Sequence, residues 1–414
     1  MPGNSDTMRI VVIGNGPAAM SAIKAIAAHK AMLSGSKADV TIISAETCQA
    51  YSPMFLVDYL TGALQLDQIL LRESYGLACR RLHGEKATRV CDERNSVILE
   101  NGKEIEYDRL LIVSGASPIV PAIRGVEKEG VFFLNRLDDA ERLSRRIRIA
   151  TKVIVIGAGM VGVEAAIAFR KMGRNVSVIE AVDHILPQML DKELADRAEK
   201  KMRSLGIQFM LGAKASEIVG SKVSTGVVVG DKEIEGDLIL VATGVMPNVD
   251  FLERSNVTIN KGIIVDEKMR TTVPNIYAAG DVAESIDPYG GREILPNWYN
   301  SAEQGWIAGC NLIGLDITCP YSPPVSVLKG AEPAVVAVGR VYGDAGYEIL
   351  SYSDTCRGVY EKMFLRDQRM DAYQAIGMVD KVGLMYNYIR GRKDLRVIKE
   401  ELNRSVFGAT LMCH

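Results

Sequence analysis

The 414-residue chain has few of the residues that usually build metal and redox centres. It contains seven cysteines but no CxxC pair, so a zinc ribbon, a thioredoxin-type dithiol or an Fe–S cluster held by this chain is poorly supported. Its four histidines leave little material for a histidine-based metal site or a catalytic triad. We therefore predict no metal site.

The sequence also lacks a strong charge and a long apolar run. Its net charge of −2 gives no sign of nucleic-acid binding. The longest apolar runs, such as residues 10–13 and 238–242, are of strand length, far short of the ~18 residues of a membrane span. The polar, acidic N-terminus is unlike a signal peptide, so we expect a cytoplasmic protein. Hydrophobic residues make up 48%, which is ordinary for a globular chain of two or three domains.

What the sequence does contain is an internal repeat. Residues 8–20 (MRIVVIGNGPAAM) and 151–166 (TKVIVIGAGMVGVEAA) each give an apolar strand, a glycine turn and a helical pattern. Each copy continues to a hairpin signal, Asn101-Gly102 or Gly230-Asp231, and then to a returning strand. The copies end alike, as IEYDRLLIVSGASP and IEGDLILVATGVMP. The repeat predicts two similar α/β domains.

The two glycine turns have the spacing of dinucleotide-binding turns. In this motif the first glycine makes the turn, the second lets a pyrophosphate approach the backbone, and the third position needs a small residue. The phosphates then lie at a helix N-terminus, where free N–H groups favour negative charge. An acid at the end of the following strand, Glu46 or Glu180, accepts hydrogen bonds from the adenosine ribose.

Two dinucleotides in one chain suggest one cofactor that is held and one that is exchanged, so we expect FAD and a nicotinamide cofactor. Glu180 would repel the 2′-phosphate of NADPH, and Ala181-Val182-Asp183 supply no arginine to bind it. NADH is therefore the expected reductant.

Residues 271–284 (TTVPNIYAAGDVAE) resemble the second FAD motif of the pyridine nucleotide-disulfide oxidoreductase superfamily. The resemblance implies an α/β fold with two Rossmann-like FAD/NAD(P)-binding domains of the three-layer ββα type and a C-terminal α+β interface domain. The expected boundaries are 1–122 and 246–320 for a discontinuous FAD domain, 123–245 for the NAD domain, and 321–414 for the interface domain with its tail. In the family, the residue matching Asp281 binds the FAD ribityl chain.

The turns and the resemblance together give the candidate site residues. No catalytic residue is certain, although the resemblance places Glu164 near the nicotinamide; the alternative is a helix-surface carboxylate. Trp298 either lines the flavin ring or belongs to the core. The FAD candidates are Gly14, Gly16, Pro17, Ala18, Glu46, Ser114, Gly115, Ala116, Gly280, Asp281, Val282 and Trp298. The NAD candidates are Gly157, Gly159, Val161, Gly162, Glu164, Glu180 and Gly244.

Differences between this sequence and the usual pattern of the family limit the functions that we expect. Residues 51–62 (YSPMFLVDYLTG) lack the CxxxxC of the disulfide reductases and resemble the cysteine-free branch of rubredoxin and ferredoxin reductases and nitrite reductase flavin domains. That branch usually has a basic residue where Pro53 and Met54 stand. Cys48 precedes the expected position of a redox thiol, which Leu56 occupies; the thiol hypothesis is kept as a minor one.

With no cysteine relay, electrons would leave the flavin directly. We expect an NADH:acceptor oxidoreductase that passes single electrons to an Fe–S protein, rubredoxin or ferredoxin. It would act as a homodimer or as the NADH-handling subunit of a larger complex, such as a 2-oxoacid:acceptor oxidoreductase. The alternatives are an NADH oxidase that uses oxygen and a redox-sensing flavoprotein of the apoptosis-factor type. Basic segments 142–148 and 390–399, and the tail 400–414, are candidate partner surfaces or ordinary solvated segments.

Overall fold

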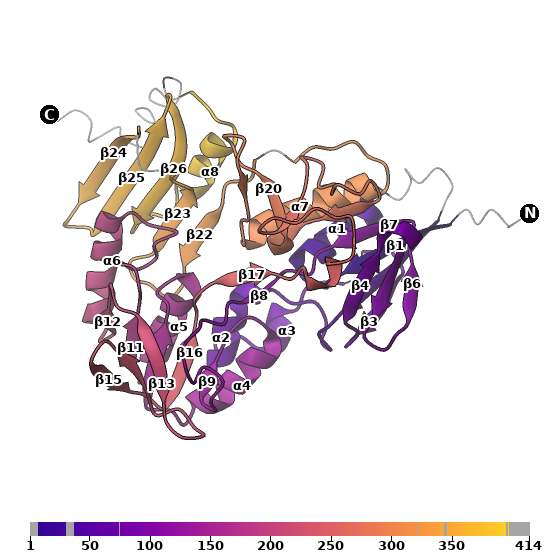
Figure 1. Ribbon diagram of the computed structural model, residues 1–414. Coiled ribbons are helices and arrows are strands. Elements are labelled where there is room, and N and C mark those ends of the chain that lie inside the picture. The colour runs from indigo at the N-terminus through magenta and orange to yellow at the C-terminus, as the bar shows by residue number, and fades with distance from the viewer. Residues whose placement is uncertain are drawn as a thin grey trace, which may run out of the picture. The chain divides into compact units, whose positions relative to one another are not determined.

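A computed structural model of the chain describes residues 7–29, 37–73, 75–319, 321–342, 346–394 and 396 (Figure 1). The chain forms two compact units. Unit 1 comprises Met1–Ile119 and Val245–Ser322, and unit 2 comprises Val120–Gly244 and Pro323–His414. Since residues 323–414 fall in the same unit as residues 120–244, the division into three domains stays a prediction.

Unit 1 is built on a five-stranded parallel sheet in the order β19-β7-β1-β2-β3. Its strands are β1 (Thr7–Ile13), β2 (Lys37–Ser44), β3 (Cys79–His83), β7 (Arg109–Ile112) and β19 (Ile276–Ala278). Helices α1 (Pro17–Ala28) and α7 (Trp298–Leu312) pack side by side (Figure 1). An antiparallel meander adds β4 (Ala87–Cys91), β5 (Ser96–Leu99) and β6 (Glu104–Glu106). The shorter elements are α2 (Leu56–Thr61), α3 (Leu66–Ile69), β8 (Ala116–Pro118), β17 (Val245–Pro247), β18 (Ile263–Ile264), β20 (Ala283–Ile286) and β21 (Arg292–Glu293).

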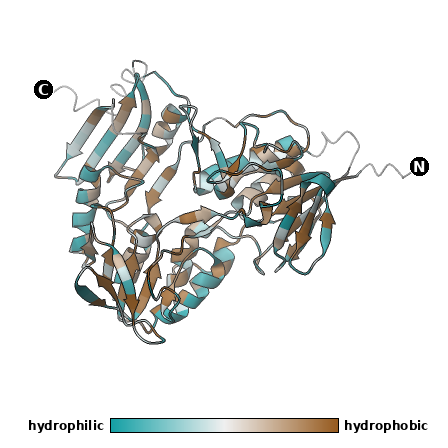
Figure 2. Ribbon diagram, in the orientation of Figure 1, coloured by the Kyte–Doolittle hydropathy of each residue, from teal (hydrophilic) through white to brown (hydrophobic). Residues whose placement is uncertain are grey.

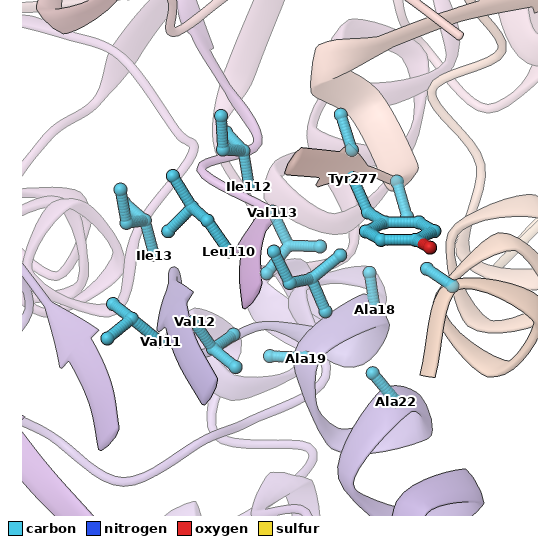
Figure 3. Packing of buried hydrophobic residues seen from close by; sticks show 14 of the residues in the cluster. Val11, Val12, Ile13, Ala18, Ala19, Ala22, Leu110, Ile112, Val113 and Tyr277 are labelled. Atoms are coloured by element: carbon cyan, nitrogen blue, oxygen red, sulfur yellow. The ribbon is translucent and has the colours of Figure 1, made fainter. Parts of the chain in front are cut away.

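The core of unit 1 explains why β1 ends in the apolar run 10–13. A parallel sheet that is covered on both faces buries every side chain of its central strands. Val11 and Val12 of β1 are buried and pack with Ala19 of α1 and Leu110 of β7 (Figure 3). The small alanine side chains of α1 let this helix lie close to the sheet.

Unit 2 repeats the plan of unit 1. Its parallel sheet has the order β12-β11-β10-β16-β9, built from β9 (Val131–Phe132), β10 (Lys152–Ile156), β11 (Asn175–Ile179), β12 (Gln208–Met210) and β16 (Leu238–Val241). Helix α5 (Met160–Lys171) follows the second glycine turn, and the meander is β13 (Ala215–Val219), β14 (Gly226–Val229) and β15 (Lys232–Glu235). Helices α4 (Leu137–Ile147) and α6 (Lys192–Ser204) complete this part. Strands β16-β10-β11-β12 repeat the order of β7-β1-β2-β3 in unit 1, so the predicted repeat is confirmed. The fifth strand differs, because β9 precedes the repeat in the chain whereas β19 follows it.

Unit 2 also contains a five-stranded antiparallel sheet, in the order β22-β23-β26-β25-β24. Its elements are β22 (Val325–Leu328), β23 (Val335–Gly339), β24 (Glu348–Asp354), β25 (Val359–Arg366), β26 (Arg369–Ile376) and helix α8 (Val382–Arg390). The residue patterns of 359–366 and 381–391 predict a strand and a helix, and β25 and α8 agree with them. The tail at 400–414 lies outside the described residues.

The hydropathy of the elements follows this layering. Figure 2 shows mostly hydrophobic strands in the parallel sheets, whereas α6 is largely hydrophilic. Only a narrow stripe of α6 is buried, consisting of Leu194, Ala195, Ala198 and Met202. Among the described residues, no helix is both long and apolar enough to cross a membrane.

Candidate functional site: two dinucleotide turns

The first glycine of each turn cannot be replaced. Gly14 and Gly157 have φ angles of +119° and +107°, in the region that favours glycine. A Cβ atom on Gly14 would overlap the carbonyl of Val113, and one on Gly157 would overlap the carbonyl of Ala242. Each turn therefore lies tight against the returning strand of its own sheet, at the carboxyl end of that sheet. Ligands bind at this end in open α/β folds.

The second glycine of each turn begins a helix without a side-chain cap. Gly16 is the N-cap of α1 and Gly159 the N-cap of α5, and among the described residues neither helix start has a side-chain capping hydrogen bond. Apart from the adjoining residues, no atom of the described part of the chain lies within 4 Å of the place where a Cβ atom of either glycine would stand. The free N–H groups and the open space can accept a pyrophosphate.

The third positions are small, as the motif requires. Ala19 is fully buried, and a Cβ atom on Gly162 would overlap the carbonyl of Gly157. Nearby, Pro17 begins α1, where its missing N–H costs nothing. Val161 is 43% exposed on the first turn of α5.

The two candidate ribose acids are held in different ways. Glu180 follows β11, and its carboxylate accepts hydrogen bonds from the backbone N–H groups of Ala158 (2.6 Å) and Val182 (2.9 Å). Glu46 follows β2, and its Oε2 accepts a hydrogen bond from the Tyr51 hydroxyl at 2.8 Å. Both carboxylates keep free lone pairs that can accept hydrogen bonds from ribose hydroxyls.

Asp281 lies in a 3-10 turn, Gly280–Val282, directly after β19. The hydroxyl of Ser301 donates to Asp281 Oδ1 at 2.8 Å, and the Gly280 N–H donates to Gln304 Oε1 at 2.8 Å. Burial raises the pKa of Asp281 above its usual value, and the hydrogen bond from Ser301 only partly offsets this. A desolvated carboxylate with one donor is suited to accept further hydrogen bonds from a polyhydroxyl chain.

Gly280 places this turn beside the first dinucleotide turn. The position of a Cβ atom on Gly280 lies 3.2 Å from Ser301 Oγ and 3.3 Å from the Ala18 side chain. The starts of α1 and α7 and the end of β19 therefore meet at one point. The structure brings together Ala18, Gly280 and Asp281, which are predicted FAD residues from distant parts of the chain.

Ser114, Gly115 and Ala116 lead from β7 into β8, which pairs with β17. Asn248 secures this segment, because its Nδ2 donates to the Ser114 carbonyl at 2.8 Å and its N–H donates to the Gly115 carbonyl at 3.0 Å. The Ser114 hydroxyl in turn donates to the Asn248 carbonyl at 2.9 Å. These mutual bonds fix the backbone where the sequence predicts a flavin contact.

Trp298 begins α7, whose N-cap Asn297 accepts the Tyr299 N–H at 2.9 Å. The indole Nε1 of Trp298 is buried and has no hydrogen-bond partner among the described residues. Asn15 Oδ1, within the first glycine turn, is also buried, and the described part of the chain offers it no partner. Buried polar atoms in native proteins nearly always have partners. Two such atoms around this turn, together with the open helix N-terminus and the desolvated Asp281, fit a polar dinucleotide such as FAD.

Glu164 does not lie on a helix surface. It is buried on α5, and its Oε1 accepts the backbone N–H of Lys329 at 3.1 Å. Gly244, with φ of +103°, ends the segment after β16. The position of Glu164 relative to a nicotinamide stays a prediction.

The thiol candidate Cys48 lies beside the first ribose acid, with its Sγ 3.9 Å from Glu46 Oε2. Leu56, at the expected position of a redox cysteine, is a buried residue of α2. Within the described part of the chain, no group of three or more His, Cys, Asp or Glu side chains could hold a metal ion.

Sequence reasoning missed Ser301, Gln304 and Asn248 as contributors. Ser301 and Gln304 are three residues apart on one face of α7, a spacing that could have marked them as a polar pair facing inward. Asn248 had no such signal, because its partners lie about 130 residues earlier in the chain.

Residues 8–305 match the family described as pyridine nucleotide-disulphide oxidoreductase, and the chain belongs to it. The chain is an NAD(P)H-dependent flavoprotein oxidoreductase, as members of this family bind FAD and NAD(P)H.

Similar proteins have several different enzyme names. The chain is 32% identical to an NADH oxidase of Methanocaldococcus jannaschii, over 75% of this chain and 71% of that protein. It is 29% identical to the NADH-dependent phenylglyoxylate dehydrogenase subunit epsilon of Aromatoleum evansii, over 94% of this chain and 93% of that subunit. The solved structure of NADH:rubredoxin oxidoreductase from Clostridium acetobutylicum is similar with a TM-score of 0.76 and 25% identity, covering 96% of this chain and 100% of that one.

Proposed function

We propose that this chain is an FAD-dependent NADH:acceptor oxidoreductase that delivers single electrons to an Fe–S protein or to a rubredoxin- or ferredoxin-type carrier. The observation that carries the proposal is the pair of equivalent glycine turns, each at the carboxyl end of its own parallel sheet and each next to an acid. A bound flavin supplies the ability to take a hydride and to release electrons one at a time.

In this proposal unit 1 holds the flavin. The uncapped start of α1 would bind the pyrophosphate, Glu46 the adenosine ribose and Asp281 the ribityl chain. Ser301 keeps the Asp281 carboxylate oriented, and Gln304 holds the turn that carries it. Trp298 and the start of α7 would face the ring system, where the positive end of the helix dipole favours negative charge.

Unit 2 would bind NADH. The uncapped start of α5 takes the pyrophosphate, and Glu180 accepts hydrogen bonds from both ribose hydroxyls. Because Glu180 is fixed by two backbone N–H groups, its carboxylate cannot easily turn away from a 2′-phosphate. The resulting repulsion favours NADH over NADPH.

The acceptor is proposed from two considerations. Cys48, the one cysteine near residues 51–62, lies beside Glu46, at the adenosine end of the proposed site, which supports electron release without a thiol. The relatives include a rubredoxin reductase and a subunit of a larger dehydrogenase. We therefore favour a redox-protein partner, in the cytoplasm, for either a homodimer or a subunit of a multi-subunit enzyme.

An NADH oxidase is the second candidate, favoured by the relative of that name. One mixing experiment separates the two candidates: reduce the protein with NADH under anaerobic conditions, admit air, and follow the flavin absorbance. Reduced flavin that persists for minutes, and is reoxidised at once by an added ferredoxin or rubredoxin, supports the proposal. Reoxidation by air within one turnover time would replace it with the oxidase. Cys48→Ser should leave NADH turnover unchanged under either outcome.

A further inference from the structure

The first glycine turn carries a polar side chain that the second turn lacks. Asn15 stands between Gly14 and Gly16, where Ala158 stands in the second turn. Its Nδ2 lies 3.4 Å from Glu73 Oε1, while its Oδ1 is buried and has no partner among the described residues. One end of this amide is therefore engaged by the protein, and the other end is not.

Glu73 is itself held by two other segments. Its Oε1 accepts the backbone N–H of Ala50 at 2.8 Å, and its Oε2 lies 3.2 Å from Arg81 Nε on β3. Arg81 also donates to the backbone carbonyl of Glu73 at 2.5 Å. The side chains of Glu73 and Arg81 are only 17% and 19% exposed, so this ion pair is a firm anchor.

The anchor decides which way the amide of Asn15 faces. A carboxylate accepts hydrogen bonds and cannot donate them, so it selects the NH2 end of the amide. The carbonyl end, Oδ1, is then directed away from Glu73 and kept as an acceptor. An unpaired buried acceptor is costly, and a donor supplied by the cofactor would remove that cost.

The donor must be sought near the adenosine half of the cofactor. Asn15 lies at the carboxyl end of β1, and Glu46 at that of the adjacent strand β2. Glu73 also fixes Ala50, in the segment that runs from Glu46 to Tyr51. In a dinucleotide site these strand ends face the adenosine ribose and its surroundings.

We propose that Asn15, oriented by Glu73, is a flavin-specific binding residue whose Oδ1 accepts a hydrogen bond from an amine or hydroxyl of the adenosine half of FAD. The inference rests on the proposed flavin site in unit 1. It gives a physical difference between the two turns, because the retained cofactor gains a side-chain acceptor that Ala158 cannot offer to the exchanged one.

The test uses the full-length protein, stripped of flavin and titrated with FAD, with ADP and with FMN. Asn15→Leu should weaken FAD and ADP binding about tenfold, the effect of about one buried hydrogen bond, and leave FMN binding unchanged. Glu73→Gln, which removes the charge that orients the amide, should weaken FAD binding by a smaller factor. Asn256→Leu is the matched control, because Asn256 also donates to a carboxylate of unit 1, that of Asp92 at 2.7 Å.

Two results would overturn the inference: FAD affinity of Asn15→Leu equal to that of the control, or an equal loss for FAD and FMN, which would mean that the turn is merely distorted. Asn15→Ala removes the same acceptor without adding bulk and decides the question if the leucine variant does not fold. If the unsubstituted protein fails to bind FAD, the proposed function fails. If it binds FAD and Asn15→Ala binds it equally well, only this inference fails.

Discussion

Glu180 Oε2 lies 2.6 Å from the backbone nitrogen of Ala158 and accepts its hydrogen bond. The acid at the end of β11 is thus joined to the middle of the glycine turn that follows β10. The matching acid of unit 1, Glu46, is instead bonded by the side chain of Tyr51. The two repeats share a backbone plan, but their acids accept hydrogen bonds from different donors.

Glu180→Ala should reduce the preference for NADH over NADPH about tenfold or more. The substitution removes two acceptors for ribose hydroxyls, each worth about 1 kcal/mol, and it also removes the charge that repels a 2′-phosphate. The measurement is the ratio of kcat/KM for the two reductants. Glu235→Ala, an exposed acid paired with Lys152 in the same unit, is the control and should leave the ratio unchanged. An unchanged ratio in Glu180→Ala would show that this residue does not bind the ribose.

Gly157→Ala should abolish NADH binding while the flavin stays bound. The new Cβ atom would overlap the carbonyl of Ala242 and force the second turn out of shape, whereas the first turn belongs to unit 1. The flavin absorbance reports that the protein has folded, and stopped-flow reduction by NADH reports the second site. A variant reduced by NADH at the normal rate and concentration dependence would contradict the assignment of this turn.

Asp281→Asn should stabilise the flavin-free protein at neutral pH and weaken its hold on FAD. Burial raises the pKa of Asp281, so the folded protein binds the proton more tightly than the unfolded chain does. The stability contributed by this group is therefore full below the unfolded pKa and is lost as pH rises through the folded pKa. Thermal unfolding of the apoprotein between pH 4 and 8, compared with that of Asp281→Asn, measures the difference. Equal pH profiles and full flavin content in the variant would rule out the role given to this carboxylate.

The parts of this structure that the sequence predicted depend on local geometry. A positive φ angle at Gly14 or Gly157 and the hairpins at Asn101-Gly102 and Gly230-Asp231 are set by a few adjacent residues. The residue types at these turns therefore indicate them directly in the sequence. Repetition of the same signals in both halves then predicted two similar α/β domains, which the two parallel sheets confirm.

What the sequence could not predict depends on contacts between distant segments. The carboxylate of Glu164 accepts the backbone N–H of Lys329, 165 residues later, and a backbone N–H leaves no mark in a sequence. The role of Asn248 depends on the Ser114 carbonyl, 134 residues earlier. The joining of residues 323–414 to residues 120–244 in one unit likewise depends on side chains that look like ordinary surface charges.

Lys362 joins the C-terminal antiparallel sheet to helix α6. Its Nζ lies 2.5 Å from Asp191 Oδ2 and 2.6 Å from Glu193 Oε2, at the start of α6, while its side chain is only 10% exposed. The hydrogen bond from Lys362, with one from Arg197, lowers the pKa of Glu193. The stability that Glu193 contributes is therefore present at pH values above the usual pKa of a glutamate, and it is lost as pH falls through the lowered pKa.

Lys362→Met keeps the apolar stem but leaves Asp191 and Glu193 without their shared cation. Because the cation is buried and the acids are partly exposed, we expect the free energy of unfolding to fall by about 2 kcal/mol. This value lies between those of surface and buried ion pairs. Urea unfolding measures this loss. Lys192→Met removes an exposed lysine of α6 and should lower the free energy of unfolding by less than about 0.5 kcal/mol. Equal losses in the two variants would mean that the C-terminal sheet is held to α6 by other contacts.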